Sequence, residues 1–499
     1  MNRLRRRVLR ALVALGALRP ASPFAADAPL WLDAAGTPTP GAREALALLA
    51  SAGDDGLVAD DYRVPPAPAD DAAAWDRALT RAVLQYLHDL HLGRVEPREL
   101  GFRLPARPAV DLSARLREAL AEGRLARLAD ELRPRFPVYR RLREQLPKYR
   151  ALAAAPPAPP LPAVARVRPG ERWAGAAVLR VWLAALGDLA PDAPAADDPS
   201  RYDTTLAAAV VRFQRRHGLE PDGVLGRATL AALDVPPARR ARQIELALER
   251  LRWLPPLGRE PFIAINIALF RLWAWDPAAA TTPLETGVIV GRALKTPTPV
   301  FVEQMRYLIF RPYWNVPRSI VRDEILPALA RNPLYLSQHD MEIVRGPGDD
   351  AQPVPAGAHN VALLAQGALR LRQRPGPDNS LGLVKFIFPN DANVYLHGTP
   401  ARQLFGRARR DFSHGCVRVE DPVALAQWVL RDQPQWTRER IEGAMAGPQS
   451  NRRVDLKRAL PTVLFYMTAT VLPGQREVHF ADDIYGHDAA LERRLAARR

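Results

Sequence analysis

The chain has 499 residues, 48% of them hydrophobic, so it is long enough for two to four domains and too apolar to be disordered throughout. Its 70 Lys and Arg against 54 Asp and Glu give a net charge of +16, but the basic residues are spread along the chain without any zinc-finger, RNP or basic-arm pattern. We therefore expect no nucleic-acid partner, and attraction to another anionic polymer stays open. A single cysteine, Cys416, excludes an internal disulfide framework and any site built from several cysteines.

Residues 1–28 resemble an export signal. The basic start "MNRLRRRVLR" precedes a short apolar run that ends in small residues. Arg10 interrupts the apolar run and Pro29 follows the Ala-x-Ala site, so the segment is read either as a cleaved signal peptide or as an N-terminal anchor that associates with a membrane. No later run approaches the 18 uncharged apolar residues of a membrane span.

Residues 29–152 are expected to form a helical scaffold domain. Three segments carry apolar residues at helical spacing, namely "REALALLASAG", "WDRALTRAVLQYLHDLHLG" and "DLSARLREALAEGRLARLADELRP". The proline-rich stretch "AAAPPAPPLPAVA" at 153–165 is typical of a semi-rigid linker. It predicts a boundary between two folding units.

A small helical unit is predicted for residues 166–236. Leu206, Val210 and Phe213 fall on one side of a helix, and "PDG" then makes a turn before a short helix that begins near Gly226. Another amphipathic helix, in residues 237–261, is expected to connect this unit to the next domain.

From Phe262 the apolar period changes to that of strands, as in "FIAINIALFRLWAW" and "NVYLHG". We expect a mostly β domain over residues 262–445 and therefore an α+β multidomain chain. The segment at about 313–371 is less strand-like and is interpreted as a lid-like insertion over the sheet. Residues 446–499 are interpreted as a C-terminal extension that packs on this domain.

The lone cysteine lies in "DFSHGCVRVEDP". A thiol of ordinary pKa, near 8.5, is mostly protonated at neutral pH and needs a base to become a nucleophile. The preceding hairpin "LVKFIFPNDANVYLHGTP" is expected to place Tyr395 and His397 on one strand face. We expect His397 to be the base and His414 to orient the site or to lie on its oxyanion side, while Gly415 lets backbone N–H groups, including that of Cys416, point at an oxyanion.

Other interpretations of these residues remain. Cys416 could be a small buried apolar residue, or His397, His414 and Cys416 could bind zinc, although no acidic residue that would activate water lies at a familiar spacing. Arg418 either forms an ion pair with Asp411 or Glu420 or lies near a substrate carboxylate.

The motif resembles that of a known family. "HGT", followed after a gap by "SHGCVRV", is similar to the catalytic signature of L,D-transpeptidases with the YkuD-type domain. "FQRRHGLEPDG" followed by "GRAT" resembles the three-helix peptidoglycan-binding-like domain, whose binding of the wall stays open. "PYWNVPRSI" and "DDIYGHD" resemble the large periplasmic YcbB-like branch. Some of its members have Ser where this chain has His414, which favours His397 as the base.

The resemblance implies a reaction. Cys416 would attack the carbonyl between meso-diaminopimelate and D-Ala of a tetrapeptide stem, expel D-Ala, and pass the acyl group to a second stem as a 3→3 cross-link. It further implies a periplasmic enzyme of wall synthesis and cell shape that carbapenems acylate, that needs no metal or organic cofactor, and that meets stem peptides and other wall-synthesis proteins. The candidate substrate-binding residues are Tyr395, Ser413, Arg418 and Trp314.

Three alternatives stay open at this point. Water could replace the acceptor amine, which would make the protein an L,D-carboxypeptidase that trims tetrapeptide stems. The chain could instead be a non-catalytic wall-binding scaffold, or it could attach a lipoprotein to the wall.

Overall fold

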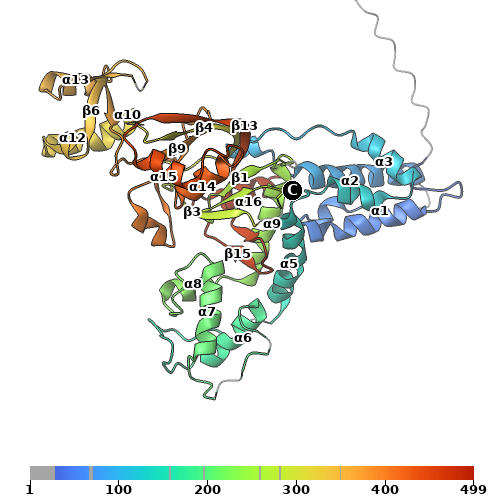
Figure 1. The fold of residues 1–499 in the computed structure, drawn as a ribbon. Helices are drawn as coiled ribbons and strands as arrows, with labels where there is room; N and C mark the ends of the chain where they lie inside the picture. Colours follow the sequence, from blue (N-terminus) through green and yellow to red (C-terminus); the bar gives the residue numbers. More distant parts are fainter. Residues whose placement is uncertain are drawn as a thin grey trace, which may run out of the picture.

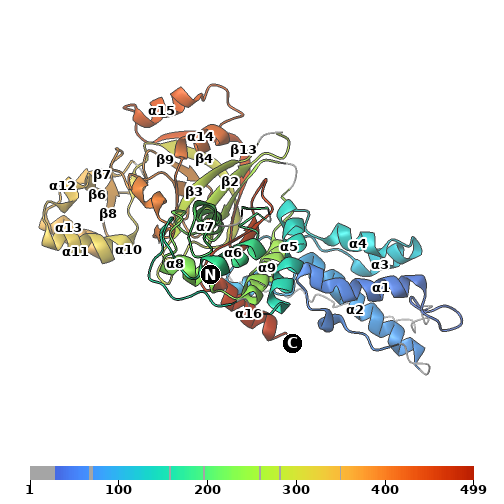
Figure 2. The same cartoon turned by 90° about the horizontal axis from the view of Figure 1, so that it is seen from below.

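The computed structural model describes residues 29–66, 71–156, 159–190, 192–194, 197–257, 260–279, 282–348 and 350–498. The predicted export signal, residues 1–28, and part of the predicted linker lie outside these residues. Four apolar cores organise the described chain: those of a scaffold domain, a small helical module, a β domain and an insertion in the β domain. Figures 1 and 2 show the scaffold helices and the insertion at opposite ends of the molecule, with the β domain between them. None of the helices in these ranges combines the length and the apolar character needed to cross a membrane.

The scaffold domain is helical. Side-chain oxygens of Thr39, Asp71 and Asp111 accept backbone N–H groups at the starts of three of its helices, which satisfies donors that a helix leaves unpaired. Its elements are α1 (Pro40–Ala50), η1 (Ser51–Asp55), η2 (Ala59–Tyr62), α2 (Ala72–Leu92), η3 (Pro97–Leu100), α3 (Leu112–Ala121) and α4 (Leu125–Leu132).

Two long helices join the domains at the centre of the molecule, α5 (Pro137–Ala154) and α9 (Pro237–Trp253). Apolar residues of both helices belong to the core of the β domain, so α5 packs away from the scaffold core despite lying in the segment assigned to that domain. The predicted connecting helix α9 is buried along most of its length. It therefore belongs to the interior and does not merely connect two units.

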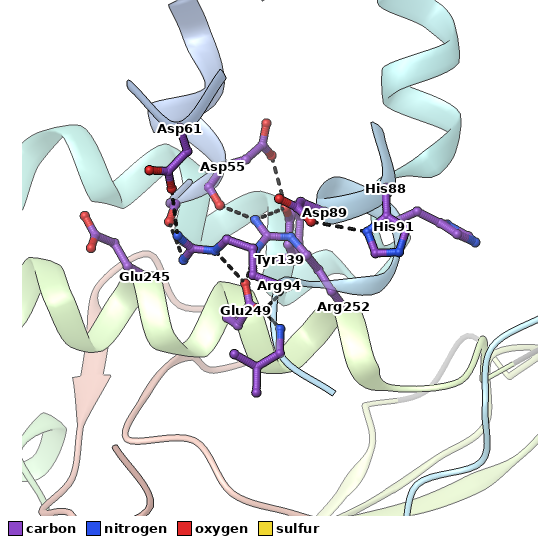
Figure 3. Close-up of polar contacts among 12 residues, drawn as sticks. Asp55, Asp61, His88, Asp89, His91, Arg94, Tyr139, Glu245, Glu249 and Arg252 are labelled. Atoms are coloured by element: carbon purple, nitrogen blue, oxygen red, sulfur yellow. Dashed lines mark hydrogen bonds and ion pairs between the residues drawn. The ribbon is translucent and has the colours of Figure 1, made fainter. Parts of the chain in front are cut away.

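A buried polar cluster fastens the scaffold domain to α9 (Figure 3). The carboxylate of Glu249 accepts hydrogen bonds from the backbone N–H groups of Arg94 and Val95 and from Nη1 of Arg252, the last at 2.9 Å. Nε of Arg94 approaches the same carboxylate at 3.4 Å. Glu249 and Arg252 are fully buried, so these charges rely on one another in place of water.

The helical module has its own core, which includes Leu206, Val210 and Phe213 on one side of α7 as the sequence predicted. Its helices are α6 (Ala176–Leu186), α7 (Thr204–Arg216) and α8 (Arg227–Leu233). Nη2 and Nε of Arg216 bind the Asp188 carboxylate, and Nη1 donates to the backbone oxygen of Val478 at 3.3 Å, which ties the module to the β domain.

The β domain is built on a nine-stranded sheet in the order β11-β3-β12-β10-β9-β4-β13-β1-β2. Because β3 also pairs with β2, eight of these strands form a closed ring, and β11 adds to β3 beyond it. The strands are β1 (Phe262–Asn266), β2 (Arg271–Trp275), β3 (Leu284–Gly291), β4 (Phe301–Phe310), β9 (Val384–Ile387), β10 (Leu396–His397), β11 (Asp411–Ser413), β12 (Val417–Val419) and β13 (Arg452–Phe465).

The C-terminal segment corrects the sequence interpretation. Strand β13 pairs with β4 on one side and with β1 on the other, so it lies within the ring and is not part of an extension packed outside it. Its first half is largely exposed and a register shift interrupts it after Asp455, which hides the alternation expected of a strand. The remaining elements are η5 (Arg402–Gly406), α14 (Pro422–Val429), α15 (Arg438–Ala446), β14 (Ala469–Val471), β15 (Val478–Phe480) and α16 (His487–Ala496).

The predicted insertion is a separate small subdomain. It contains a four-stranded sheet in the order β5-β8-β6-β7, where the sequence indicated little strand structure, and this sheet extends the insertion to Gln373. Its elements are β5 (Trp314–Asn315), α10 (Arg318–Ile320), the π-helical turn η4 (Val321–Ile325), α11 (Leu326–Arg331), α12 (Tyr335–Gln338), β6 (Met341–Arg345), β7 (Gln352–Val354), α13 (Ala358–Gln366) and β8 (Arg370–Gln373).

Candidate active site

Strands β10 and β12 place the candidate residues on one face of the sheet. The two strands run parallel, with Leu396 opposite Val417 and His397 opposite Arg418. Leu396 and Val417 belong to the apolar core, and side chains alternate between the faces of a strand. The flanking residues therefore share the opposite face: Tyr395 and Cys416 just before the two strands, and His397 and Arg418 within them.

His397 is held in one tautomer. Its Nδ1 lies 2.5 Å from the backbone oxygen of Gly398, and a carbonyl oxygen only accepts, so we assign the hydrogen to Nδ1 and the lone pair to Nε2. The backbone oxygen of Leu381 also lies close to the ring. Burial, and next the positive charge of Arg418, lower the pKa of His397 to about 3. The imidazole is therefore neutral at physiological pH and available as a base.

The Cys416 thiol rests in its protonated form. Burial raises the pKa of Cys416 and outweighs the opposite effects of Tyr395 and Arg418. Its Sγ lies 3.7 Å from the backbone oxygen of Asn393, a contact suited to a weak S–H donor. Thiol and imidazole are thus both neutral in this structure, so Cys416 would need a base to remove its proton before it could act as a nucleophile.

Tyr395 and Arg418 border the thiol. The rings of Tyr395 and His397 lie 5.8 Å apart, and burial together with the neighbouring Cys416 raises the pKa of Tyr395. Among the described residues Arg418 forms neither of the ion pairs considered from the sequence: Asp411 pairs with Arg409, and Glu420 accepts the backbone N–H of Gly287. In the part of the chain that the structure describes, its buried Nε has no hydrogen-bond partner. Arg418 is therefore left as a cation beside the thiol.

The turn before Cys416 corrects the prediction for Ser413 and part of the prediction for Gly415. The Ser413 hydroxyl accepts a bond from the Gly415 N–H at 3.2 Å and donates to the Cys416 oxygen at 2.5 Å, so it is buried in the turn and does not face a substrate. The Gly415 N–H is thereby engaged and does not serve an oxyanion. Gly415 instead supplies a backbone with φ of +111°. The Cys416 N–H follows it, and no hydrogen bond from this group is found among the described residues.

His414 points toward the insertion. Its Nε2 lies 2.6 Å from Oε1 of Glu324 in η4, and Arg292 approaches the same carboxylate at 3.9 Å. The ring is therefore engaged with the insertion and not with the thiol, contrary to the expected role on the oxyanion side. Trp314 packs against the core of the insertion. The sequence pattern gave no reason to select Glu324, because its partner lies 90 positions away.

Nothing in the site has the form of a metal centre. Within the described ranges, no three His, Cys, Asp or Glu side chains gather as ligands for a metal ion. The two histidine contacts lead elsewhere, to the Gly398 oxygen and to Glu324. The arrangement is that of a thiol, a neutral base and a nearby cation, which can carry out acyl transfer.

Comparisons with known proteins agree with this chemistry. Residues 260–443 match the YkuD model, described as the L,D-transpeptidase catalytic domain, residues 25–146 match a scaffold domain, and residues 175–233 match a "putative peptidoglycan binding domain". A Haemophilus influenzae protein named "Putative L,D-transpeptidase" is 30% identical over 250 residues. That match spans 50% of this chain and 49% of the relative, about half of each. Residues 260–443 are therefore similar to the catalytic domain of L,D-transpeptidases, and the matches to a scaffold domain and to a peptidoglycan-binding domain precede them in the chain.

Proposed function

We propose that this protein is a peptidoglycan L,D-transpeptidase that joins the meso-diaminopimelate residues of two stem peptides through a thioester on Cys416. One observation carries the proposal: the free thiol of Cys416 and the neutral imidazole of His397 share one sheet face in a domain that matches L,D-transpeptidases. A scaffold that only bound the wall would have no use for this pair.

In the first step, Sγ of Cys416 attacks the carbonyl carbon between diaminopimelate and D-Ala, and its proton passes to Nε2 of His397. The thiol must first turn away from the Asn393 oxygen that it contacts at rest. The Cys416 N–H donates to the oxyanion of the tetrahedral intermediate. His397 then returns the proton to the departing amine, D-Ala leaves, and a thioester remains.

In the second step, the side-chain amine of another stem's diaminopimelate attacks the thioester carbon. His397 takes a proton from this amine and returns it to the departing sulfur, which restores the thiol. The net change is one new amide bond for the amide bond broken, with D-Ala released. No cofactor enters the balance.

The flanking groups suit a stem peptide. Arg418, which keeps an unpaired buried Nε, is proposed to bind a substrate carboxylate, and Tyr395 is proposed to form a wall of the donor pocket. The match of residues 175–233 to a peptidoglycan-binding domain supports peptidoglycan as the substrate. We further propose a periplasmic location on the strength of the signal-like residues 1–28, and acylation of Cys416 by carbapenems, because the same thiol would attack their strained carbonyl.

The test is mass spectrometry of the purified chain incubated with disaccharide-tetrapeptide in water enriched in oxygen-18, with Cys416→Ala alongside. We expect a dimer lighter than two substrates by one D-Ala, absent from the variant. A tripeptide carrying oxygen-18 as the sole product would make the protein an L,D-carboxypeptidase. Neither product and no thioester adduct would overturn the catalytic assignment.

A further inference from the structure

The peptide bond that carries the Cys416 N–H also contains the carbonyl of Gly415. In a trans peptide the C=O and N–H groups lie in one plane and point in opposite directions. A group that binds the Gly415 oxygen therefore also fixes the direction in which the Cys416 N–H points. The structure shows such a contact: Oγ1 of Thr298 lies 2.8 Å from the Gly415 oxygen.

The direction of this hydrogen bond is fixed. Oγ1 of Thr298 also receives the N–H of Gly291 at 2.9 Å, so its own hydrogen is left for the Gly415 oxygen. Thr298 is almost fully buried, which shields the bond from competing water. A carbonyl that accepts a hydrogen bond also makes the N–H of the same peptide a better donor.

A second hydroxyl, that of Tyr485, fixes the backbone of Thr298. The Tyr485 hydroxyl accepts the Thr298 N–H at 3.1 Å and donates to the Gly291 oxygen at 2.6 Å. Burial raises the pKa of Tyr485 to about 12, so the phenol keeps the hydrogen that it donates. Tyr485 belongs to the "DDIYGHD" segment, for which the reaction itself gives no role.

The close packing around Gly291 leaves no room for Thr298 and the turn at Gly415 to shift relative to each other. A Cβ atom at Gly291 would lie 2.0 Å from the Thr296 oxygen, 2.8 Å from the Thr298 nitrogen and 3.0 Å from Cα of Gly415. The backbone beside β3 thus passes directly under the catalytic turn. Any shift of Thr298 is transmitted to the turn that carries Cys416.

We propose that Thr298 and Tyr485 are positioning residues that hold the peptide between Gly415 and Cys416 and so aim the Cys416 N–H at the oxyanion of the acyl-transfer step. The proposal rests on the proposed function only in assuming that Cys416 is acylated through a tetrahedral intermediate. It predicts that losing either hydroxyl harms reactions that develop an oxyanion and spares those that do not.

The experiment compares two reagents on the full chain. A carbapenem acylates a thiol through an oxyanion, whereas iodoacetamide alkylates it by direct displacement without one. Both rates are followed by the mass of the intact protein, and the carbapenem concentration is varied to separate the affinity of the first complex from the acylation rate constant. The variants are Thr298→Val and Tyr485→Phe, which remove one hydroxyl each, and Thr298→Ser, which restores it.

We expect Thr298→Val and Tyr485→Phe to slow acylation about 10- to 100-fold, with the first-complex affinity and the alkylation rate within about twofold of wild type. Thr298→Ser should recover most of the acylation rate. The matched control is Tyr202→Phe, because the Tyr202 hydroxyl donates to a glycine oxygen, that of Gly223, at 2.7 Å in the helical module. This control should acylate as wild type does.

Three outcomes would overturn the proposal. These are unchanged acylation in both Thr298→Val and Tyr485→Phe, equal slowing of acylation and alkylation, or a Thr298→Ser variant as slow as Thr298→Val. A wild-type protein that acylates but makes no cross-link would count against the proposed function and leave the positioning role standing. If iodoacetamide alkylates the wild-type protein but a carbapenem never acylates it, both the proposed function and the positioning role are refuted.

Discussion

Replacing Glu249 with glutamine tests how firmly the buried polar cluster holds the scaffold domain to α9. Glu249 is fully buried, and its carboxylate faces the guanidinium groups of Arg94 and Arg252. Glu249→Gln keeps the size of the side chain but leaves two buried cations without their shared counter-charge. Breaking a buried ion pair by removing one partner costs about 3–5 kcal/mol. We expect the free energy needed to separate the scaffold domain from α9 to decrease by that amount.

Native-state hydrogen exchange reports this quantity region by region, which suits a chain of several domains. Exchange of the α2 and α9 amides should speed up about 100-fold or more in Glu249→Gln, as a loss of about 3–5 kcal/mol requires. The matched control is Glu245→Gln, on the same helix, whose side chain is 18% exposed and pairs with Arg150 and Arg242. It should cost less than about 1 kcal/mol. Equal protection in the two variants would refute the reasoning.

The geometry of the site and of the scaffold interface supports three further predictions. Since the pKa of His397 is lowered to about 3, the imidazole stays neutral and carbapenem acylation should be nearly flat from about pH 5.5 to 8, with an acid limb near pH 6.5 counting against this role. The same lowering of the pKa affects stability, because in the unfolded chain His397 regains its ordinary pKa of about 6.5 and binds a proton below that pH. The free energy of unfolding of the wild-type protein should therefore fall as the pH drops below about 6.5, and it should fall less in His397→Gln. Gly93→Ala should destabilise the protein far more than Gly101→Ala in thermal melts: both glycines have positive φ, but a Cβ at Gly93 would lie 2.6 Å from Trp253, whereas Gly101 has open space.

The sequence predicted the parts of the site that depend on local pattern. The alternation in "NVYLHG" correctly placed Tyr395 and His397 on one face, because a strand that has one face in the core fixes the other. The change of period at Phe262 likewise marked the start of β1. Both inferences need only neighbouring residues.

The features of the site that the sequence did not predict depend mostly on contacts between residues far apart in the chain. The direction of the His414 ring is set by Glu324, and the role of Ser413 is set by how a tight turn closes its own hydrogen bonds. Strand β13 was missed because Pro461 and its exposed, charged first half obscure the period of two. Thr298 and Tyr485 lie 187 positions apart, so only the folded chain brings them together.

The closed ring of strands has a consequence for the order of folding. Ile263 pairs with Thr462 in the β1–β13 ladder, so the ring cannot close until nearly the whole chain is present. Pairings of such long range form late and slowly. Before then, β1 and β4 each keep an unpaired edge open to other chains, and the turn around Cys416 lacks the support of Tyr485. The turn around Cys416 therefore gains its full set of supporting contacts only as folding is completed.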